Sequence, residues 1–193
     1  MGDHGRSMGW CAYVDESEPD PRFAAGTYLL AAAVIETDEL LAARAAVAAL
    51  RLRGQKKLHW RGEGAPRRRR IASSIAALPM MHTIVVKVDK DASSERRRRL
   101  CMARLLPELH TAGVTDVYLE SREKKQNAGD IELLNGLRRQ KALTSDLRIY
   151  HVPGPNDALL WVPDVVAGAM GSQLAGEPVY LDMFATTLVV YDA

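Results

Sequence analysis

Tyr13-Val14-Asp15-Glu16-Ser17 is an apolar strand sequence that ends in two neighbouring carboxylates. The acids stand where a strand normally buries its side chains. An unpaired buried carboxylate is costly, so its presence calls for a metal ion, a basic partner or a cleft. Asp15 and Glu16 are therefore the first candidates for a functional site.

Two more acids stand at comparable places further along the chain. Glu120 follows the apolar run Val117-Tyr118-Leu119, and Asp164 lies within the apolar segment 160–169. Carboxylates on a first strand, at the end of a later strand and on a final helix can converge on divalent metal ions, which prefer oxygen ligands. This layout predicts a nuclease.

The size and composition fit one globular domain. The chain has 193 residues, of which 47% are hydrophobic and 26% are charged, enough for a core that folds alone. We expect a flexible N-terminal arm at residues 1–10 and a single domain at residues 11–193. The longest apolar run, 28–35, falls far short of the ~20 residues that cross a bilayer. We therefore expect neither a membrane span nor a signal sequence.

Composition and motifs also disfavour several classes of metal site and of enzyme. Cys11 and Cys101 are the only cysteines and form no CxxC pair or Cys/His cluster, which argues against zinc and indicates the reducing cytoplasm. The net charge of +2 does not by itself indicate nucleic acid. The sequence has no GxGxxG, P-loop or GxSxG motif, which disfavours a small-molecule enzyme with a nucleotide cofactor or a serine nucleophile.

Strands and helices alternate along most of the chain. Two adjacent strands come first, joined by a proline-containing turn at 18–21, and the continuous apolarity of the second is typical of a strand covered on both faces. Thr37 and either Ser93 or Ser94 are predicted helix caps, and Gly113 a helix end. The predicted strands are 11–17, 25–35, 82–89, 116–120 and 147–152, and the predicted helices are 37–52, 67–78, 95–111, 127–141 and 158–175. This order predicts an α/β fold of three layers, a mixed central sheet with helices on both faces.

Four segments together carry a family resemblance that runs from about residue 12 to 172. They are Tyr13-Val14-Asp15-Glu16-Ser17, Lys57-Leu58-His59-Trp60, Leu119-Glu120-Ser121-Arg122 and the segment 159–169 around Asp164. The chain resembles an uncharacterised prokaryotic family whose members open with a Tyr-(Ile/Val)-Asp-Glu-Ser strand and close with an Ala-Asp-hydrophobic-hydrophobic-Ala-Gly helix. That family is placed in the ribonuclease H-like superfamily, with resolvases and transposases.

The resemblance implies a ribonuclease H-like domain with a two-metal nuclease site. Superfamily nucleases use two Mg²⁺ or Mn²⁺ ions to activate water and to stabilise the leaving oxygen. The resemblance assigns Asp15 as the bridging ligand, with Glu120 and Asp164 completing the catalytic set. The chain departs from the family pattern at Glu18, where a glycine is usual, and at Trp161-Val162-Pro163, which replaces a Gln-hydrophobic-Ala stretch. Neither departure removes an acid.

Three further acids have more than one interpretation. Strand alternation points Glu16 away from Asp15, so it is either a metal ligand or the partner of a basic residue on the opposite face. Asp157 lies seven residues before Asp164 and is either a further ligand on the same helical face or a helix cap; Pro163 would kink a helix that contained both. Asp130 is expected to cap a helix rather than to act in the site.

Basic residues supply candidates for nucleic-acid binding, to DNA or to RNA. Lys57, His59, Arg122, Lys124 and Lys125 are predicted to bind substrate phosphate, with His59 also able to assist proton transfer. A salt bridge from Lys57 or His59 to Glu16 is the structural alternative. The arginine runs 67–70 and 96–99 are either solvated helix faces or contacts to a phosphate backbone.

Two functional classes therefore remain open. One is a metal-dependent phosphodiesterase that acts on nucleic acid, and the other is a catalytically inactive ribonuclease H-like protein that binds partners. Trp60 and Trp161 are expected to be buried beside the sheet rather than to stack on bases. The apolar tail segments 179–181 and 188–191 predict an edge strand or a contact with a second copy, as in a homodimer.

Overall fold

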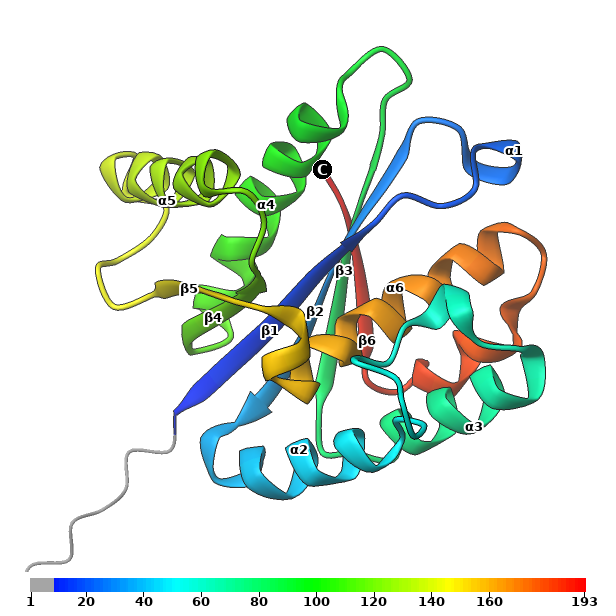
Figure 1. Cartoon of the computed structure of the whole chain (residues 1–193). Coiled ribbons are helices and arrows are strands. Elements are labelled where there is room, and N and C mark those ends of the chain that lie inside the picture. Colours follow the sequence, from blue (N-terminus) through cyan, green and yellow to red (C-terminus); the bar gives the residue numbers. More distant parts are fainter. Residues whose placement is uncertain (1–8) are drawn as a thin grey trace, which may run out of the picture.

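The computed structural model describes residues 9–193, so most of the predicted N-terminal arm, residues 1–10, lies outside it. Its centre is a mixed six-stranded sheet of order β5-β4-β1-β2-β3-β6 (Figure 1). β1 is antiparallel to β2 and parallel to β4, β2 is antiparallel to β3, and the outer strands β5 and β6 are parallel to their neighbours. The strands are Trp10–Ser17, Thr27–Glu36, Met81–Val88, Val114–Glu120, Arg148–Val152 and Leu188–Asp192.

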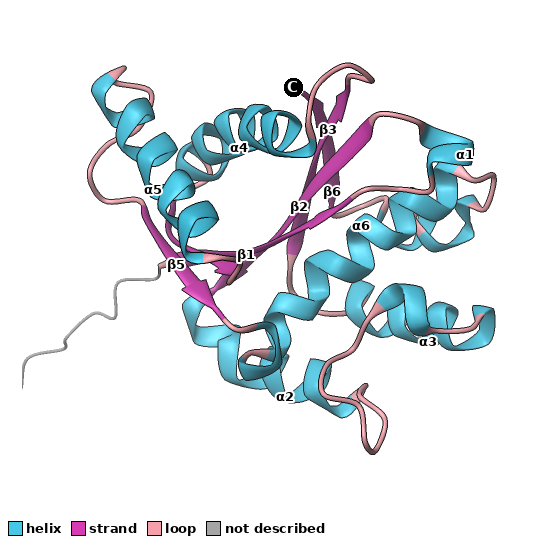
Figure 2. Ribbon diagram, turned by 45° about the horizontal axis from the view of Figure 1, so that its top comes forward, coloured by secondary structure: helices cyan, strands magenta, loops and turns pink. Residues whose placement is uncertain are grey.

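Helices cover both faces of this sheet, which confirms the predicted three-layer α/β class (Figure 2). α2, α3 and α6 pack on one face, and α4 and α5 pack on the other. β2 is buried along almost its whole length, as its continuous apolarity predicts for a strand covered on both sides. The helices are α1 Pro21–Ala24, α2 Leu40–Ala49, α3 Ala65–Ala76, α4 Ser94–Thr111, α5 Lys124–Arg139 and α6 Trp161–Leu174.

Several helix starts differ from the predicted ones for local reasons, and one predicted cap is confirmed. The turn at 18–21 leads into the short helix α1, whose first turn is capped by the Asp20 side chain. Thr37 does not cap α2 but opens a 3-10 turn, Thr37–Glu39. α5 begins at Lys124, three residues earlier than predicted, because Glu123 and Gln126 form a capping box. Ser93 does cap α4, accepting a hydrogen bond from the Arg96 N–H.

The start of α6 also differs from the prediction. Ala158–Leu160 is a 3-10 turn, and the α-helix begins at Trp161. Pro163 therefore lies in the first turn, where a missing N–H costs no helical hydrogen bond, and the predicted kink does not apply.

The C-terminal tail supplies the predicted edge strand. β6 pairs in parallel with β3, from His82 opposite Leu188 to Val86 opposite Asp192. The other apolar tail segment is a 3-10 turn, Pro178–Tyr180, whose Tyr180 packs in the core of the α6 face. Within residues 9–193 no helix is long and apolar enough to cross a membrane.

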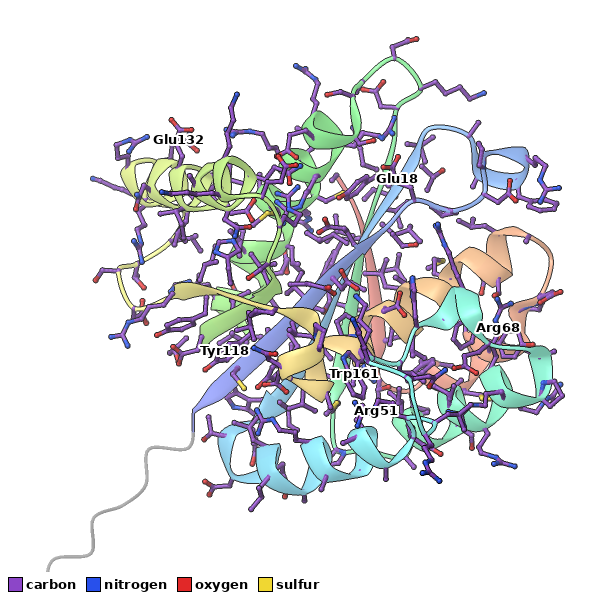
Figure 3. The ribbon with its side chains drawn as sticks, viewed as in Figure 1. Glu18, Arg51, Arg68, Tyr118, Glu132 and Trp161 are labelled. Atoms are coloured by element: carbon purple, nitrogen blue, oxygen red, sulfur yellow. The ribbon has the colours of Figure 1, made fainter. Side chains whose placement is uncertain are left out.

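Trp60 and Trp161 are both buried, as expected. The guanidinium of Arg51 lies over the Trp161 ring, 6.0 Å from its centroid (Figure 3). Trp60 is 3% exposed and packs edge-on against Tyr180. Its indole also lies directly on Gly168 of α6, where a β-carbon would come within 2.3 Å of the ring. Glycine at 168 is therefore what lets the segment that carries Trp60 approach α6.

We expect Gly168→Ala to destabilise the fold by roughly 1–3 kcal/mol, because a buried indole has little room to retreat. Chemical denaturation measures this change. Gly171→Ala, in the same helix, is the matched control, since its β-carbon would meet only Pro19 at an ordinary 3.9 Å. The control should be neutral or stabilising by about 0.5–1 kcal/mol, and equal losses in both variants would contradict the packing argument.

Candidate active site

Asp15, Glu120 and Asp164 line one cavity of about 290 Å³. β1 and β4 are parallel neighbours with Val14 opposite Leu119, so their carboxyl ends place Asp15 and Glu120 side by side at one edge of the sheet. Asp164 comes from the first turn of α6, the helix that packs across β1 and β2. The structure thus brings together the three acids that the sequence indicates.

Asp15 is a buried carboxylate with other carboxylates near it. Burial first, and then the nearby Asp164, Glu16 and Glu120 carboxylates, raise the pKa of Asp15 well above its ordinary value. The Glu16 backbone N–H donates to Asp15 Oδ1 at 2.8 Å and opposes this rise. A buried acid that lies among other acids is a property expected of a cation site.

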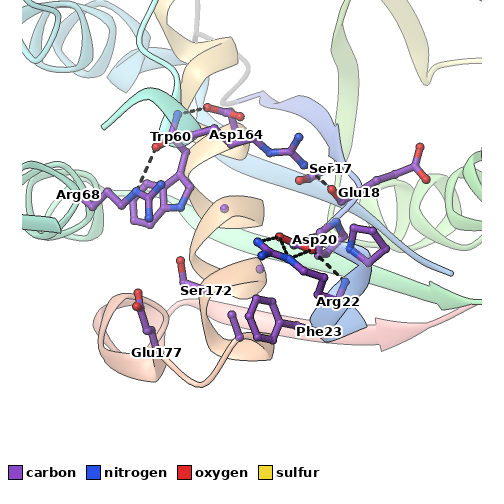
Figure 4. Close-up of a pocket in the computed structure, with 16 residues that line it drawn as sticks. Ser17, Glu18, Asp20, Arg22, Phe23, Trp60, Arg68, Asp164, Ser172 and Glu177 are labelled. Atoms are coloured by element: carbon purple, nitrogen blue, oxygen red, sulfur yellow. Dashed lines mark hydrogen bonds and ion pairs between the residues drawn. The ribbon is translucent and has the colours of Figure 1, made fainter. Parts of the chain in front are cut away.

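Asp164 is held from the loop that precedes α3. The Trp60 backbone N–H donates to Asp164 Oδ2 at 2.7 Å (Figure 4). His59 Nδ1 lies 3.1 Å from the same oxygen. This hydrogen bond raises the pKa of His59 above its ordinary value. His59 thus pairs with Asp164 rather than with Glu16, and its half-exposed ring faces the cavity.

Glu120 is held by a cation and by a glycine. Lys57 Nζ donates to both carboxylate oxygens, at 2.7 and 2.9 Å, so Lys57 also does not pair with Glu16. On its other side the carboxylate lies against Gly154, where a β-carbon would come within 2.4 Å of Glu120 Oε1. Trp161 Nε1 donates to the Gly154 carbonyl at 2.8 Å and fixes this cradle. The residue that departs from the family pattern at 161 therefore supports an acid of the site.

Glu16 and Asp157 both pair with arginines, although Glu16 also lines the cavity of the three acids. Alternation along β1 turns the Glu16 side chain to the α4 face, where Arg98 Nε lies 3.1 Å and Arg122 Nε 3.7 Å from its carboxylate. Asp157 pairs with Arg44 at 2.9 Å and accepts the Leu159 N–H as a cap, and it does not line the cavity of the three acids. Both side chains thus have the structural partners that formed the alternative to metal binding.

The sequence interpretation missed a buried ion pair beside the site. Asp130 is 2% exposed inside α5, so it is not a cap, and Arg98 of the second arginine run is 1% exposed. Arg98 Nη2 donates to Asp130 Oδ2 at 3.1 Å, and Nη1 bonds Oδ1 of the same carboxylate. Arg122 and His151 also bond Asp130, at 3.3 and 3.0 Å.

The helical spacing of Arg98 and Asp130 indicates that both side chains are buried. Arg98 falls on one stripe with the buried Cys101, Met102 and Leu105. Asp130 falls on one stripe with the buried Leu134 and Leu137. A charged residue at a core position of an amphipathic helix indicates a buried partner.

The remaining predicted substrate residues are distributed around the cavity. Arg122 lines it and joins Glu16, Glu95 and Asp130. Lys124 and Lys125 are exposed at the start of α5. In the first arginine run, Arg67 pairs with Glu63 and Arg68 with the Trp60 carbonyl. The two runs are thus partly structural rather than wholly solvated.

The donor set of Asp15, Glu120 and Asp164 fits a hard divalent cation, because it consists of carboxylate oxygens on three rigid elements. Across residues 9–193, however, no group of three or more His, Cys, Asp or Glu side chains is arranged to hold a metal ion as it stands. Lys57 takes both oxygens of Glu120, and Trp60 with His59 takes one of Asp164. A cation at these acids would therefore compete with Lys57 for Glu120.

A larger groove adjoins the three acids at Asp164. It has a volume of about 650 Å³ and runs along α6 towards α1 (Figure 4). Arg22, Arg61, Arg68 and the exposed ring of Phe23 line it, while Asp20 on its wall is paired with Arg22. The groove joins guanidinium groups and an aromatic ring to the acidic cavity.

No protein-family model matches the chain, and no curated protein matches it in sequence. Its fold is similar to RNase HII from Archaeoglobus fulgidus, solved in complex with PCNA, with a TM-score of 0.55 and 14% identity over 86% of this chain and 73% of that one. It is also similar to a mutant of Bst-RNase HIII, with a TM-score of 0.54 and 14% identity over 86% of this chain and 53% of that one. The chain therefore has a ribonuclease H-like α/β fold.

We expect Asp130→Asn to cost about 3 kcal/mol of folding free energy, because the buried Arg98 guanidinium loses its buried partner and keeps only the more exposed Glu16 as a counter-charge. Urea unfolding measures the loss. Glu95→Gln is the control, since Glu95 also pairs with Arg122 but its side chain is 45% exposed, and an exposed pair contributes at most ~1 kcal/mol. Comparable losses in the two variants would show that burial of the pair is unimportant.

Proposed function

We propose that the chain is a divalent-metal-dependent nuclease that hydrolyses phosphodiester bonds of DNA or RNA. The observation that carries this proposal is the convergence of Asp15, Glu120 and Asp164 on one cavity at the carboxyl ends of β1 and β4. The ribonuclease H-like fold supports it, since the two similar structures are ribonucleases by name. The finer resemblance to the uncharacterised prokaryotic family, with its opening Asp-Glu-Ser strand, points in the same direction.

Asp15, Glu120 and Asp164 would hold Mg²⁺ or Mn²⁺. We place Glu16 outside this set because its carboxylate turns to Arg98 on the α4 face, and Asp157 because it does not line the cavity. Bound ions of this kind supply Lewis-acid stabilisation of charge and an activated water. The raised pKa of Asp15 fits a role that needs a cation to balance it. Glu16 serves through its backbone, whose N–H fixes the Asp15 carboxylate.

Other residues would bind and orient the nucleic acid. Arg61 and Arg68 line the groove that reaches Asp164, and Phe23 offers an exposed ring on which a base can stack. Lys124 and Lys125 are exposed at the start of α5 and would offer positive charge to a phosphate backbone. His59, hydrogen-bonded to Asp164 through Nδ1, can exchange a proton at Nε2 with a bound phosphodiester.

One observation favours the second candidate, a ribonuclease H-like protein that binds nucleic acid without cleaving it. Lys57 occupies both oxygens of Glu120, and an ion pair that never opened would keep that acid from a metal. Cleavage assays on labelled single- and double-stranded DNA and RNA with Mn²⁺ separate the two candidates. A protein that binds these substrates but cleaves none would support the second.

Asp15→Asn should reduce Mn²⁺-dependent cleavage by at least about 100-fold while leaving the fold intact, because asparagine keeps the shape but loses the charge that balances cations. Circular dichroism checks the fold and a gel assay checks the rate. Asp116→Asn is the control, on β4 like Glu120 but outside the cavity lining. Cleavage by Asp15→Asn at the wild-type rate would disprove the assigned site.

Gly154→Ala should lower activity roughly tenfold with little loss of stability. The new β-carbon would meet the end of the flexible Glu120 side chain, so the carboxylate moves while the backbone stays. Steady-state kinetics and thermal unfolding measure the two effects. Gly129→Ala is the matched control because its β-carbon meets nothing within 4 Å, and equal activity in both variants would mean that the position of Glu120 does not matter.

A further inference from the structure

The Lys57 side chain enters the acidic cavity from the loop between α2 and α3. Its ammonium donates to both Glu120 oxygens, at 2.7 and 2.9 Å, and both side chains are only about a third or less exposed. Lys57 and Glu120 are 63 residues apart in sequence. The contact is therefore a tertiary feature of the site and not a local pairing on one element.

All three acids raise the pKa of the Lys57 ammonium. Burial lowers the pKa of Lys57, but the hydrogen bond and charge of Glu120, followed by the charges of Asp15 and Asp164, raise it above its ordinary value. Lys57 lines the same cavity as the three carboxylates. It supplies one positive charge to a group that carries up to three negative charges.

A lysine and a divalent ion would use the same atoms of Glu120. An ammonium donates hydrogen bonds to carboxylate oxygens, whereas Mg²⁺ or Mn²⁺ binds directly to the lone pairs of those oxygens. The ammonium lies 2.7 and 2.9 Å from the two Glu120 oxygens, in the position that a bidentate ion would take, and its charge repels a divalent cation, so the two compete for Glu120. The lysine has a flexible four-carbon stem, so it can give way without any movement of the backbone.

The loop around Lys57 is anchored on the side that follows it. Leu58 is 1% exposed, and Trp60 is buried against Gly168 while its N–H holds Asp164. A Lys57 side chain that leaves Glu120 therefore remains at the rim of the cavity. The phosphodiester of a bound strand is an anion that would enter at this rim.

We propose that Lys57 is a tethered cation that holds Glu120 until a divalent metal ion displaces it, and that the released ammonium then pairs with a nucleic-acid phosphate. This inference rests on the proposed nuclease function and adds to it an exchange of partners at one acid. Metal binding and substrate binding are thereby coupled through a single side chain. The coupling makes the site most receptive to a phosphate once the metal ion is in place.

Calorimetric titration of the full chain with Mn²⁺ tests whether a divalent ion displaces Lys57 from Glu120. Lys57→Met keeps the length of the side chain and removes its charge, so Mn²⁺ should bind about tenfold or more tightly than to wild type. Lys57→Gln should change affinity in the same direction. Lys56→Met is the matched control, because Lys56 is an exposed neighbour outside the cavity lining, and its affinity should stay within about twofold of wild type.

The outcomes separate the two proposals. If wild type and Lys57→Met bind Mn²⁺ equally well, or if Lys56→Met gains as much as Lys57→Met, the inference about Lys57 fails and the nuclease proposal stands. If wild type and all three variants bind no Mn²⁺, both the metal-dependent nuclease proposal and the inference about Lys57 fail. None of these readouts depends on catalytic activity.

Binding of a labelled oligonucleotide with and without Ca²⁺ tests whether the released Lys57 ammonium pairs with a nucleic-acid phosphate. Ca²⁺ prefers the same oxygen ligands but gives looser coordination than Mg²⁺, so a complex can be measured without cleavage. Ca²⁺ should increase the affinity of wild type several-fold more than that of Lys57→Met. An equal increase in both proteins would show that the released ammonium does not reach the phosphate.

Discussion

Three carboxylates gathered at the end of a central strand repel one another, and much of the surrounding structure compensates for that repulsion. Each acid receives a specific partner: Asp15 the N–H of the next residue, Asp164 the Trp60 N–H, and Glu120 the Lys57 ammonium. These partners come from β1 and from the loop before α3, which Trp60 anchors on Gly168. The close contact between that loop and α6 is thus part of the electrostatics of the site as well as of the core.

The opposite face of β1 carries a second charged network. Arg98 and Asp130 form a buried pair that also holds Glu16 and Arg122, so α4, α5 and the ends of β1 and β4 are joined by charge as well as by apolar packing. Removal of charged groups from water is expensive unless they are paired and hydrogen-bonded. The arrangement therefore fixes where β1 ends, and with it the orientation of Asp15.

The sheet and the three acids could be predicted because their signals are local. β-branched runs mark strands, continuous apolarity marks a strand covered on both faces, and an acid that ends an apolar strand is conspicuous. The partners of those acids could not be predicted in this way. Lys57 meets Glu120 across 63 residues and Arg98 meets Asp130 across 32, so helical spacing could show that Arg98 and Asp130 are buried but no local pattern could show which residue each one meets. The cradle at Gly154 depends likewise on a tryptophan from the following helix.

The strand order has a consequence for how the protein is made. β1, β2 and β3 are successive antiparallel neighbours. The ribosome therefore completes this three-stranded meander before it synthesises the remaining strands. The other edge of β1 waits for β4, which begins about a hundred residues later at Val114. During that interval this edge of β1 has no hydrogen-bonding partner, and the outer edge of β3 waits longer still, for β6 at Leu188. Unpaired strand edges invite association with other chains. Synthesis of this protein should therefore depend on chaperones more than its modest size suggests.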